Sequence, residues 1–382
     1  MTPTTITLMA LGDIWLARQV AEAIERHGVD HPFARIASTL QTADVVLGNL
    51  ESPVSTRGQP AENKEVTARA APEYLDGLVS AGIHVVTLAN NHIMDFGRPA
   101  LEDTLRFLNA RGIRHLGAGL SPGEAARPLL MKVKEMTISF HAYLCWGEDS
   151  RRSRGPAGWN RTRVAQALDR ARRQADAVIV SLHGGAIFQD YPTVEFIRMA
   201  HWAVDHGADA VIGHHPHVIQ GIERYRRGVI AYSLGNFLFD SYQQELPDDR
   251  TRQGLILRLD LHKNGPPRCR YRPIPVRITD QFQVEPVPRG EGRNIIMGRL
   301  DRLSRADIFS ENRGFIAADR ADLADKIRTL LRRPPQDILA YLAGNFFRLL
   351  RTYWRTPFQL GWRSLLNRRR RRPAAEQEHG KR

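Results

Sequence analysis

The stretch Gly207–Gln220, "GADAVIGHHPHVIQ", places three histidines shortly after an apolar run. The run Ala210–Ile212 is short, continuous and apolar, which is typical of a buried strand. His214, His215 and His217 would then sit where that strand ends and a loop begins. Three imidazoles beside a buried strand indicate either a metal site or a hydrogen-bond network, because buried polar groups need partners. Other segments of the chain decide between these two interpretations.

Further apolar runs predict more strands, and amphipathic segments such as Arg98–Arg111 and Arg161–Arg173 lie between them. Apolar runs that alternate with helical periodicity predict an α/β layered domain. The proline-rich stretch from Pro266 to Pro288 marks its expected edge. We therefore expect one domain over residues 1–285 and a helical, basic extension over residues 286–382. The other predicted strands are Thr5–Leu11, Val45–Leu47, Val85–Leu88, Thr137–Tyr143, Ala177–Leu182, Val229–Ser233 and Gly254–Leu261.

The composition excludes several classes of protein. Of the 382 residues, 42% are hydrophobic and 25% are charged, as in ordinary globular domains. Two cysteines, Cys145 and Cys269, exclude a disulfide framework and a thiolate metal site. The first residues, "MTPTTITLMALGDIW", have neither the basic start of a signal peptide nor a long apolar run. We expect no signal peptide or transmembrane segment and a cytoplasmic protein.

The net charge of +14 belongs mostly to the tail. From Ala340 onward there are 11 lysines and arginines against two glutamates, and five consecutive arginines start at Arg368. The segment "DILAYLAGNFFRLLRTYW" carries an apolar stripe at helical spacing. Residues 340–372 are expected either to lie peripherally on an anionic membrane surface at the inner face or to pack on the domain as a helix. Nucleic acid is not an expected partner, since no nucleic-acid-binding fold would orient the arginines.

Polar residues gather where the predicted strands end. In a parallel α/β sheet the carboxyl ends of strands meet along one edge, so these residues would converge. Taken alone, Asp13 is typical of a helix N-cap or a turn, and His183 of a buried histidine with a hydrogen-bond partner. Taken together, the clusters predict a shared centre of one or two divalent ions such as Mn, Fe or Zn, because carboxylate, amide and imidazole ligands without thiolate suit these metals. The clustered residues are Asp13, Asn49, Glu51, Asn90, Asn91, His92, Asp95, His183, the three histidines of the opening stretch, and Asn236.

The same segments resemble a known family. "GDIWLAR", "GNLESPVS", "LANNHIMDFG", "GADAVIGHHPHVIQGIE" and "YSLGNFLFD" are similar to the signature segments of the CapA family. These are poly-γ-glutamate capsule biosynthesis proteins within the calcineurin-like metallophosphatase superfamily. The resemblance covers about residues 5 to 262 in the family's order. It implies a four-layer α/β/β/α sandwich of metallophosphatase type, with the site on loops at one edge of two sheets.

The resemblance also implies a role for each site residue. His92 would be the proton donor, beside the metals without binding them. Trp15 stands where true metallophosphatases have a histidine, which leaves three ligands for the first metal. The implied ligands are Asp13, Glu51 and His217 for the first metal, and Glu51 as the bridge with Asn91, His183 and His215 for the second. Supporting roles fall to Asn49, Asn90, His214 and Asn236, and substrate contacts to Lys64 and Arg69.

Three functions follow as hypotheses. The first is a metal-dependent hydrolase of CapA type that acts on a phosphate ester or an anionic polymer in capsule or poly-γ-glutamate biosynthesis. The second is a non-catalytic component of a capsule synthesis or export machinery, whose pocket binds an anionic chain without cleaving it. The third is a peripheral membrane scaffold whose tail is the functional part.

Overall fold

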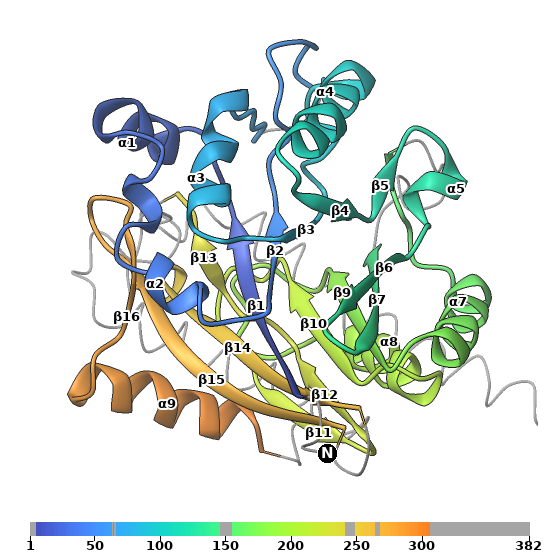
Figure 1. The fold of residues 1–382 in the computed structure, drawn as a ribbon. Coiled ribbons are helices and arrows are strands. Elements are labelled where there is room, and N and C mark those ends of the chain that lie inside the picture. Colours follow the sequence, from blue (N-terminus) through green and yellow to red (C-terminus); the bar gives the residue numbers. More distant parts are fainter. Residues whose placement is uncertain are drawn as a thin grey trace, which may run out of the picture. The chain divides into compact units, whose positions relative to one another are not determined.

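The computed structural model describes residues 5–62, 64, 66–145, 155–240, 249–263 and 268–305 (Figure 1). The chain divides into two compact units, Met1–Asp319 and Arg320–Arg382, and all described residues belong to the first. The predicted tail segment, residues 340–372, lies outside the described residues. No helix in the described part of the chain is long and apolar enough to cross a membrane.

Within the described residues, the first sheet has eight strands. Its central strands β1, β2, β3 and β4 are parallel, β13 adds to β1 in parallel, and β14, β15 and β16 extend the sheet in antiparallel fashion. The order is β16–β15–β14–β1–β2–β3–β4. The bounds are β1 Thr5–Ile14, β2 Val45–Leu50, β3 Val85–Thr87, β4 Arg114–Leu116, β13 Asn236–Leu238, β14 Gln253–His262, β15 Cys269–Ile278 and β16 Val284–Pro286.

The second sheet, as far as the structure describes the chain, has six strands in the order β11–β12–β10–β9–β7–β6. Its central strands are parallel, and both edge strands are antiparallel to their neighbours. A small two-stranded sheet pairs β5 with β8. The bounds are β5 Ala118–Gly119, β6 Leu129–Val133, β7 Met136–Leu144, β8 Gly155–Pro156, β9 Ala177–His183, β10 Ala210–His214, β11 Ile222–Tyr225 and β12 Gly228–Ala231.

Helices cover the outer faces of the two sheets (Figure 1). Helices α1, α2, α3 and α4 pack on the first sheet, while α7 and α8 pack on the second. Between the sheets, residues such as Leu8 and Leu257 of the first sheet pack against Ile179 and Ile212 of the second. The helices are α1 Gln19–His27, α2 Ala37–Leu40, α3 Leu75–Ser80, α4 Gly97–Ala110, α5 Pro122–Ala125, α7 Arg161–Gln174, α8 Val194–Asp205 and α9 Glu291–Leu303, with short 3-10 turns at His31–Phe33, Pro72–Tyr74 and Arg250–Arg252.

These layers confirm the predicted four-layer α/β/β/α fold. Every strand predicted from an apolar run is present, with ends within a few residues of the expected ones. The proline-rich stretch contains β15 and β16, which were not predicted. Pro273 and Pro275 pair with β14 on one side, while β16 pairs only with the last residues of β15, so the prolines lie near the edge of the sheet, where proline is tolerated. Ile296 and Leu300 of α9 pack into the cluster between the sheets, and the predicted domain boundary at residue 285 stays a prediction.

Candidate metal centre

The carboxyl ends of the parallel strands bring the predicted residues together. Asp13 lies near the end of β1, and Glu51 directly follows β2. His183 ends β9 and His214 ends β10. Asp13 accepts hydrogen bonds from His214 Nδ1 (3.0 Å) and from the backbone N–H of His215 (3.2 Å), so one carboxylate ties the edges of both sheets together.

Close backbone packing places Asn236 beside Asp13. The two residues are partners in the parallel pairing of β1 with β13, and the backbone N–H of Asp13 donates to Gly235 O (3.1 Å). A Cβ atom on Gly12 would lie only 2.0 Å from Gly235 O. Only glycine therefore allows β13 to approach β1 this closely, which explains Gly12 in the "LGD" segment of the sequence.

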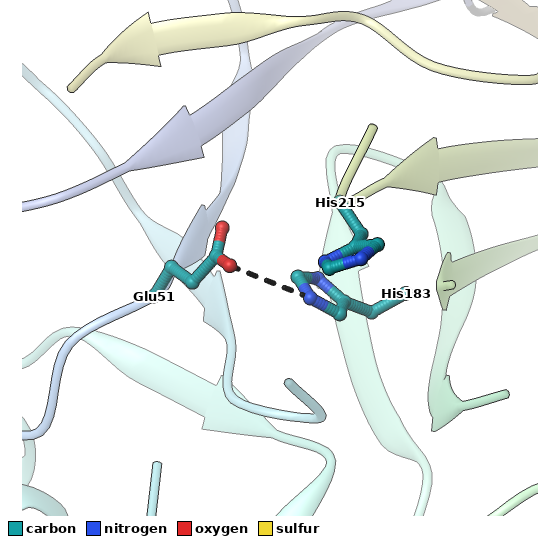
Figure 2. A group of neighbouring side chains, drawn as sticks. All are labelled: Glu51, His183 and His215. Carbon is teal, nitrogen blue, oxygen red and sulfur yellow. Dashed lines mark ion pairs between the residues drawn. The ribbon is translucent and has the colours of Figure 1, made fainter. Parts of the chain in front are cut away.

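Six predicted residues form two candidate ligand groups that share Glu51. In the first, termed the His217 group, Asp13, Glu51 and His217 place their ligand atoms within 4.8 Å of one another. The second, termed the His183 group, does the same with Glu51, His183 and His215. Asn91 joins this group through its Oδ1, which lies 2.9 Å from His183 Nε2. Figure 2 shows the Glu51 carboxylate directed at His183, with the His215 ring next to it.

The Glu51 carboxylate is the point at which the groups meet. Its Oε1 atom is buried and makes no hydrogen bond. Two imidazole nitrogens lie around this atom, His183 Nε2 at 3.5 Å and His217 Nε2 at 3.8 Å. A buried carboxylate oxygen without a hydrogen bond costs free energy unless another partner satisfies it. The donor set fits one or two divalent ions, which would be held by the ligands of the two groups.

The electrostatics suit cation binding. Burial and the neighbouring Asp13 raise the pKa of Glu51 well above its usual value. Burial opposes ionisation of Asp13 as well, but hydrogen bonds from His214 and His217 hold its pKa well below the usual value. Burial, reinforced by neighbouring histidines, lowers the pKa of His183 well below its usual value and that of His215 to about 3. His183 and His215 are therefore neutral near pH 7, which is the form that binds a metal.

The histidine turn has an unusual backbone. His215 has φ 99° and His217 has φ 58°, both in the region that favours glycine. Such residues cost about 1–3 kcal/mol each and are tolerated mainly where function requires them. With Pro216 between them, this turn directs two imidazoles toward Glu51 within three residues.

Buried amides support the ligands. Asn49 Nδ2 donates to Asp13 Oδ1 (2.8 Å) and lies 3.2 Å from His183 Nδ1. Asn90 Nδ2 donates to Asn49 Oδ1 (3.1 Å), while Asn90 Oδ1 accepts the backbone N–H of His92 (3.1 Å). Asn236 Oδ1 lies 2.9 Å from His217 Nδ1. With the bond from His214 to Asp13, every residue given a supporting role in the sequence contacts a predicted ligand or His92.

His92 is held by a carboxylate and a lysine. Its Nδ1 lies 2.7 Å from Asp95 Oδ2, and Asp95 also accepts the backbone N–H of Ala68 (2.8 Å). Lys64 Nζ forms an ion pair with Asp95, donates to Asn91 O (2.7 Å) and lies 3.2 Å from His92 Nδ1. Burial lowers the pKa of His92, although Asp95 opposes this. The sequence places Asp95 in the polar cluster after the predicted strand Val85–Leu88 but assigns it no role, and its position three residues after His92 is the further signal for one.

Two other residues bear on the sequence expectations. Arg69 is exposed, stacks over the Phe96 ring at 4.4 Å and donates to Arg57 O, so neither contact is to a candidate ligand. Trp15 is 1% exposed. Its ring stacks on Phe239 at 4.8 Å and meets the His92 ring nearly perpendicularly at 4.9 Å. Trp15 therefore forms a wall beside His92.

Residues 7–241 match the family model described as "Bacterial capsule synthesis protein PGA_cap". The chain belongs to this family. The resemblance to the CapA family drawn from the sequence is thereby confirmed.

Relatives of the chain include two Bacillus proteins. It is 30% identical over 271 residues to "Capsule biosynthesis protein CapA" of Bacillus anthracis, covering 68% of this chain and 65% of that protein. It is 32% identical over 276 residues to "PGA biosynthesis protein CapA" of Bacillus subtilis, covering 70% of each. The match thus spans just under two thirds of the first protein. Among solved structures, a putative 5'-nucleotidase from Staphylococcus aureus has a TM-score of 0.43 and 14% identity, covering 78% of this chain and 58% of that one, which is too distant to bear on function.

Proposed function

We propose that this chain is a divalent-metal-dependent hydrolase that acts on a phosphate ester or an anionic polymer in capsule production. The observation that carries the proposal is the Glu51 Oε1 atom, buried without a hydrogen bond and faced by His183 and His217. The capsule context comes from the names of its relatives, which are capsule and PGA biosynthesis proteins.

The residues divide the chemistry among them. When bound, divalent ions would supply electrostatic stabilisation of developing negative charge and lower the pKa of a water molecule. Asp13, Glu51, Asn91, His183, His215 and His217 would hold them. Asp95 accepts the Nδ1 proton of His92, which leaves Nε2 of that ring to exchange a proton with the substrate. Lys64 forms an ion pair with Asp95 and donates to Asn91 O. It therefore stabilises the loop that carries His92 at least as much as it attracts an anionic substrate.

One observation favours a second candidate, a component that binds an anionic chain without cleaving it. Trp15 fills the space next to His92 and offers no metal ligand. The His217 group therefore has three ligands, one fewer than the His183 group with Asn91. A weakly held ion would favour binding over hydrolysis.

The two candidates differ in metal content and turnover. The test compares wild type with His217→Ala and His92→Ala, measuring bound metal and hydrolysis of a generic phosphodiester. The hydrolase proposal expects wild type to hold about two metals and turn over. His217→Ala then loses metal, and His92→Ala keeps metal but loses rate. A wild-type protein that holds at most one metal and cleaves nothing with any divalent ion supports the polymer-binding candidate.

A further inference from the structure

The two ring nitrogens of His217 lie in different surroundings. Nδ1 is 2.9 Å from Asn236 Oδ1 and 3.4 Å from Asp13 Oδ2. Nε2 is directed toward Glu51 Oε1 at 3.8 Å. A neutral imidazole carries its proton on one nitrogen and a lone pair on the other. Only the nitrogen with the lone pair can bind a cation, so the proton's position decides whether His217 presents a ligand to Glu51.

The Asn236 amide is oriented by a backbone carbonyl. Its Nδ2 donates to Thr251 O at 2.9 Å. A carbonyl oxygen only accepts hydrogen bonds, so the NH2 group must face Thr251 and Oδ1 must face His217. Because Oδ1 is also only an acceptor, Nδ1 of His217 must be the donor. The carbonyl of Thr251 thus sets the position of the His217 proton through one intervening side chain.

The backbone of Asn236 is as constrained as its side chain. Asn236 is 0% exposed and pairs with Asp13 across β1 and β13. A Cβ atom on Gly254 would lie 2.0 Å from Asn236 O, so β14 also approaches it closely. The amide cannot turn over without losing its bond to Thr251, and the buried strand leaves it no water as a substitute partner.

We propose that Asn236 is a positioning residue that fixes the ring proton of His217 on Nδ1 and so presents the Nε2 lone pair toward Glu51 for a divalent cation. The inference rests on the proposed function for the identity of the ligand. Histidines that bind metals generally donate their other ring N–H to such a partner, and loss of the partner typically lowers metal affinity by about 10–100-fold.

The first test is nitrogen NMR of the histidine rings in the metal-free protein, with His217 assigned by its loss in His217→Ala. The wild-type ring is expected to carry its proton on Nδ1. Asn236→Leu removes both hydrogen bonds and is expected to give a mixture of the two ring forms. Asn236→Asp keeps the acceptor and is expected to keep the wild-type form. A proton on Nε2 in wild type overturns the proposal.

The second test is calorimetric titration of the same proteins with manganese. Asn236→Leu is expected to lose about 10–100-fold in affinity, while Asn236→Asp binds as tightly as wild type or more tightly. Wild-type affinity in Asn236→Leu overturns the proposal. Asn160→Ala, which removes a capping side chain of α7, controls for general destabilisation. If Asn236→Leu does not fold, Asn236→Ala repeats the measurement.

The two tests separate this inference from the proposed function. If the wild-type protein binds manganese but hydrolyses nothing, the hydrolase proposal is ruled out and the role of Asn236 still stands. If the wild-type protein binds no manganese, the proposed metal centre is ruled out, and with it this role of Asn236, whichever nitrogen of His217 carries the proton. If His217 of the wild-type protein carries its proton on Nε2, only the proposed role of Asn236 is ruled out.

Discussion

The two candidate ligand groups share Glu51 but hold their histidines in different ways. In the His217 group, ring Nδ1 faces an amide oxygen, that of Asn236. In the His183 group, ring Nδ1 faces the amide nitrogen of Asn49 at 3.2 Å. That nitrogen cannot be exchanged for oxygen, because Asn49 Oδ1 already accepts hydrogen bonds from Asn90 and Thr87. An amide nitrogen only donates, so His183 Nδ1 must accept and its proton lies on Nε2.

This difference sets two properties against each other. The His217 group has its lone pair directed at Glu51 and needs no rearrangement. The His183 group has one more ligand, Asn91, but its ring proton must leave Nε2 before that atom can bind a cation. The larger number of ligands favours cation binding at the His183 group, and the lone pair already directed at Glu51 favours cation binding at the His217 group. Measurements that remove one group at a time decide which property dominates.

The largest expected effect comes from the ligand that both groups share. Glu51→Gln keeps the shape of the side chain and removes its charge, so we expect manganese affinity to fall at least about 100-fold at both groups. The unfolding free energy of the metal-free variant should not fall, because the raised pKa of Glu51 keeps the wild-type side chain uncharged in part of the pH range. Calorimetric titration and urea unfolding measure the two quantities. Retention of one tightly bound ion would show that Glu51 serves only one group.

A backbone change can disrupt the His217 group alone. Gly12→Ala places a Cβ atom 2.0 Å from Gly235 O, which must push β13 and Asn236 away from Asp13. Forced overpacking of this kind costs about 1–3 kcal/mol, and we expect the upper end because the clashing atom is backbone. The variant should lose metal at the His217 group and keep it at the His183 group. Gly123→Ala, where a Cβ atom would meet open space, is the matched control. Equal metal loss from both groups would mean that they do not act separately.

The pH dependence of metal binding should follow Glu51. Its folded-state pKa is raised, so its contribution to stability is complete below its unfolded pKa of about 4.3 and is lost as pH rises through the folded value. The metal-free protein should therefore lose stability with rising pH over this range. Metal affinity should rise over the same range by up to about tenfold per pH unit, because the cation displaces a proton. Titration in two buffers of different ionisation enthalpy counts the released protons, and a count of zero would contradict the raised pKa.

Much of this arrangement could be predicted from the sequence because it is encoded locally. Apolar runs located the strands, and the polar residues after "LGD", "LGN" and "VIGH" had to meet because parallel strands end at one edge. All predicted site residues except Arg69 belong to one connected network of contacts in the described structure. Several of the strands that were missed, such as β6 and β15, lie at or near sheet edges, where exposure and proline weaken the apolar pattern.

The rest depended on contacts that local sequence does not encode. The opposite settings of His183 and His217 arise from which atom of an amide faces each ring, and Thr251 contributes only its backbone carbonyl. Lys64 resembled an exposed loop charge suited to an anionic substrate. The structure directs it to Asp95, which is 1% exposed and needs a cation nearby. Such pairings follow from burial, which becomes known only once the loop is folded.

The smallest expected effect distinguishes the two cations that were predicted to contact substrate. Lys64→Gln leaves the buried Asp95 carboxylate without its ion pair, so the unfolding free energy should fall by about 1–3 kcal/mol. Arg69→Gln removes an exposed stacking contact and an exposed hydrogen bond to Arg57 O, and should change the unfolding free energy by no more than about 1 kcal/mol. Because Lys64 contacts Asn91 and His92 but neither group's carboxylates, turnover should fall more than manganese affinity. Urea unfolding, manganese titration and turnover measurements on the two variants test this prediction. An equal effect of both variants would indicate that Lys64 is an ordinary surface charge.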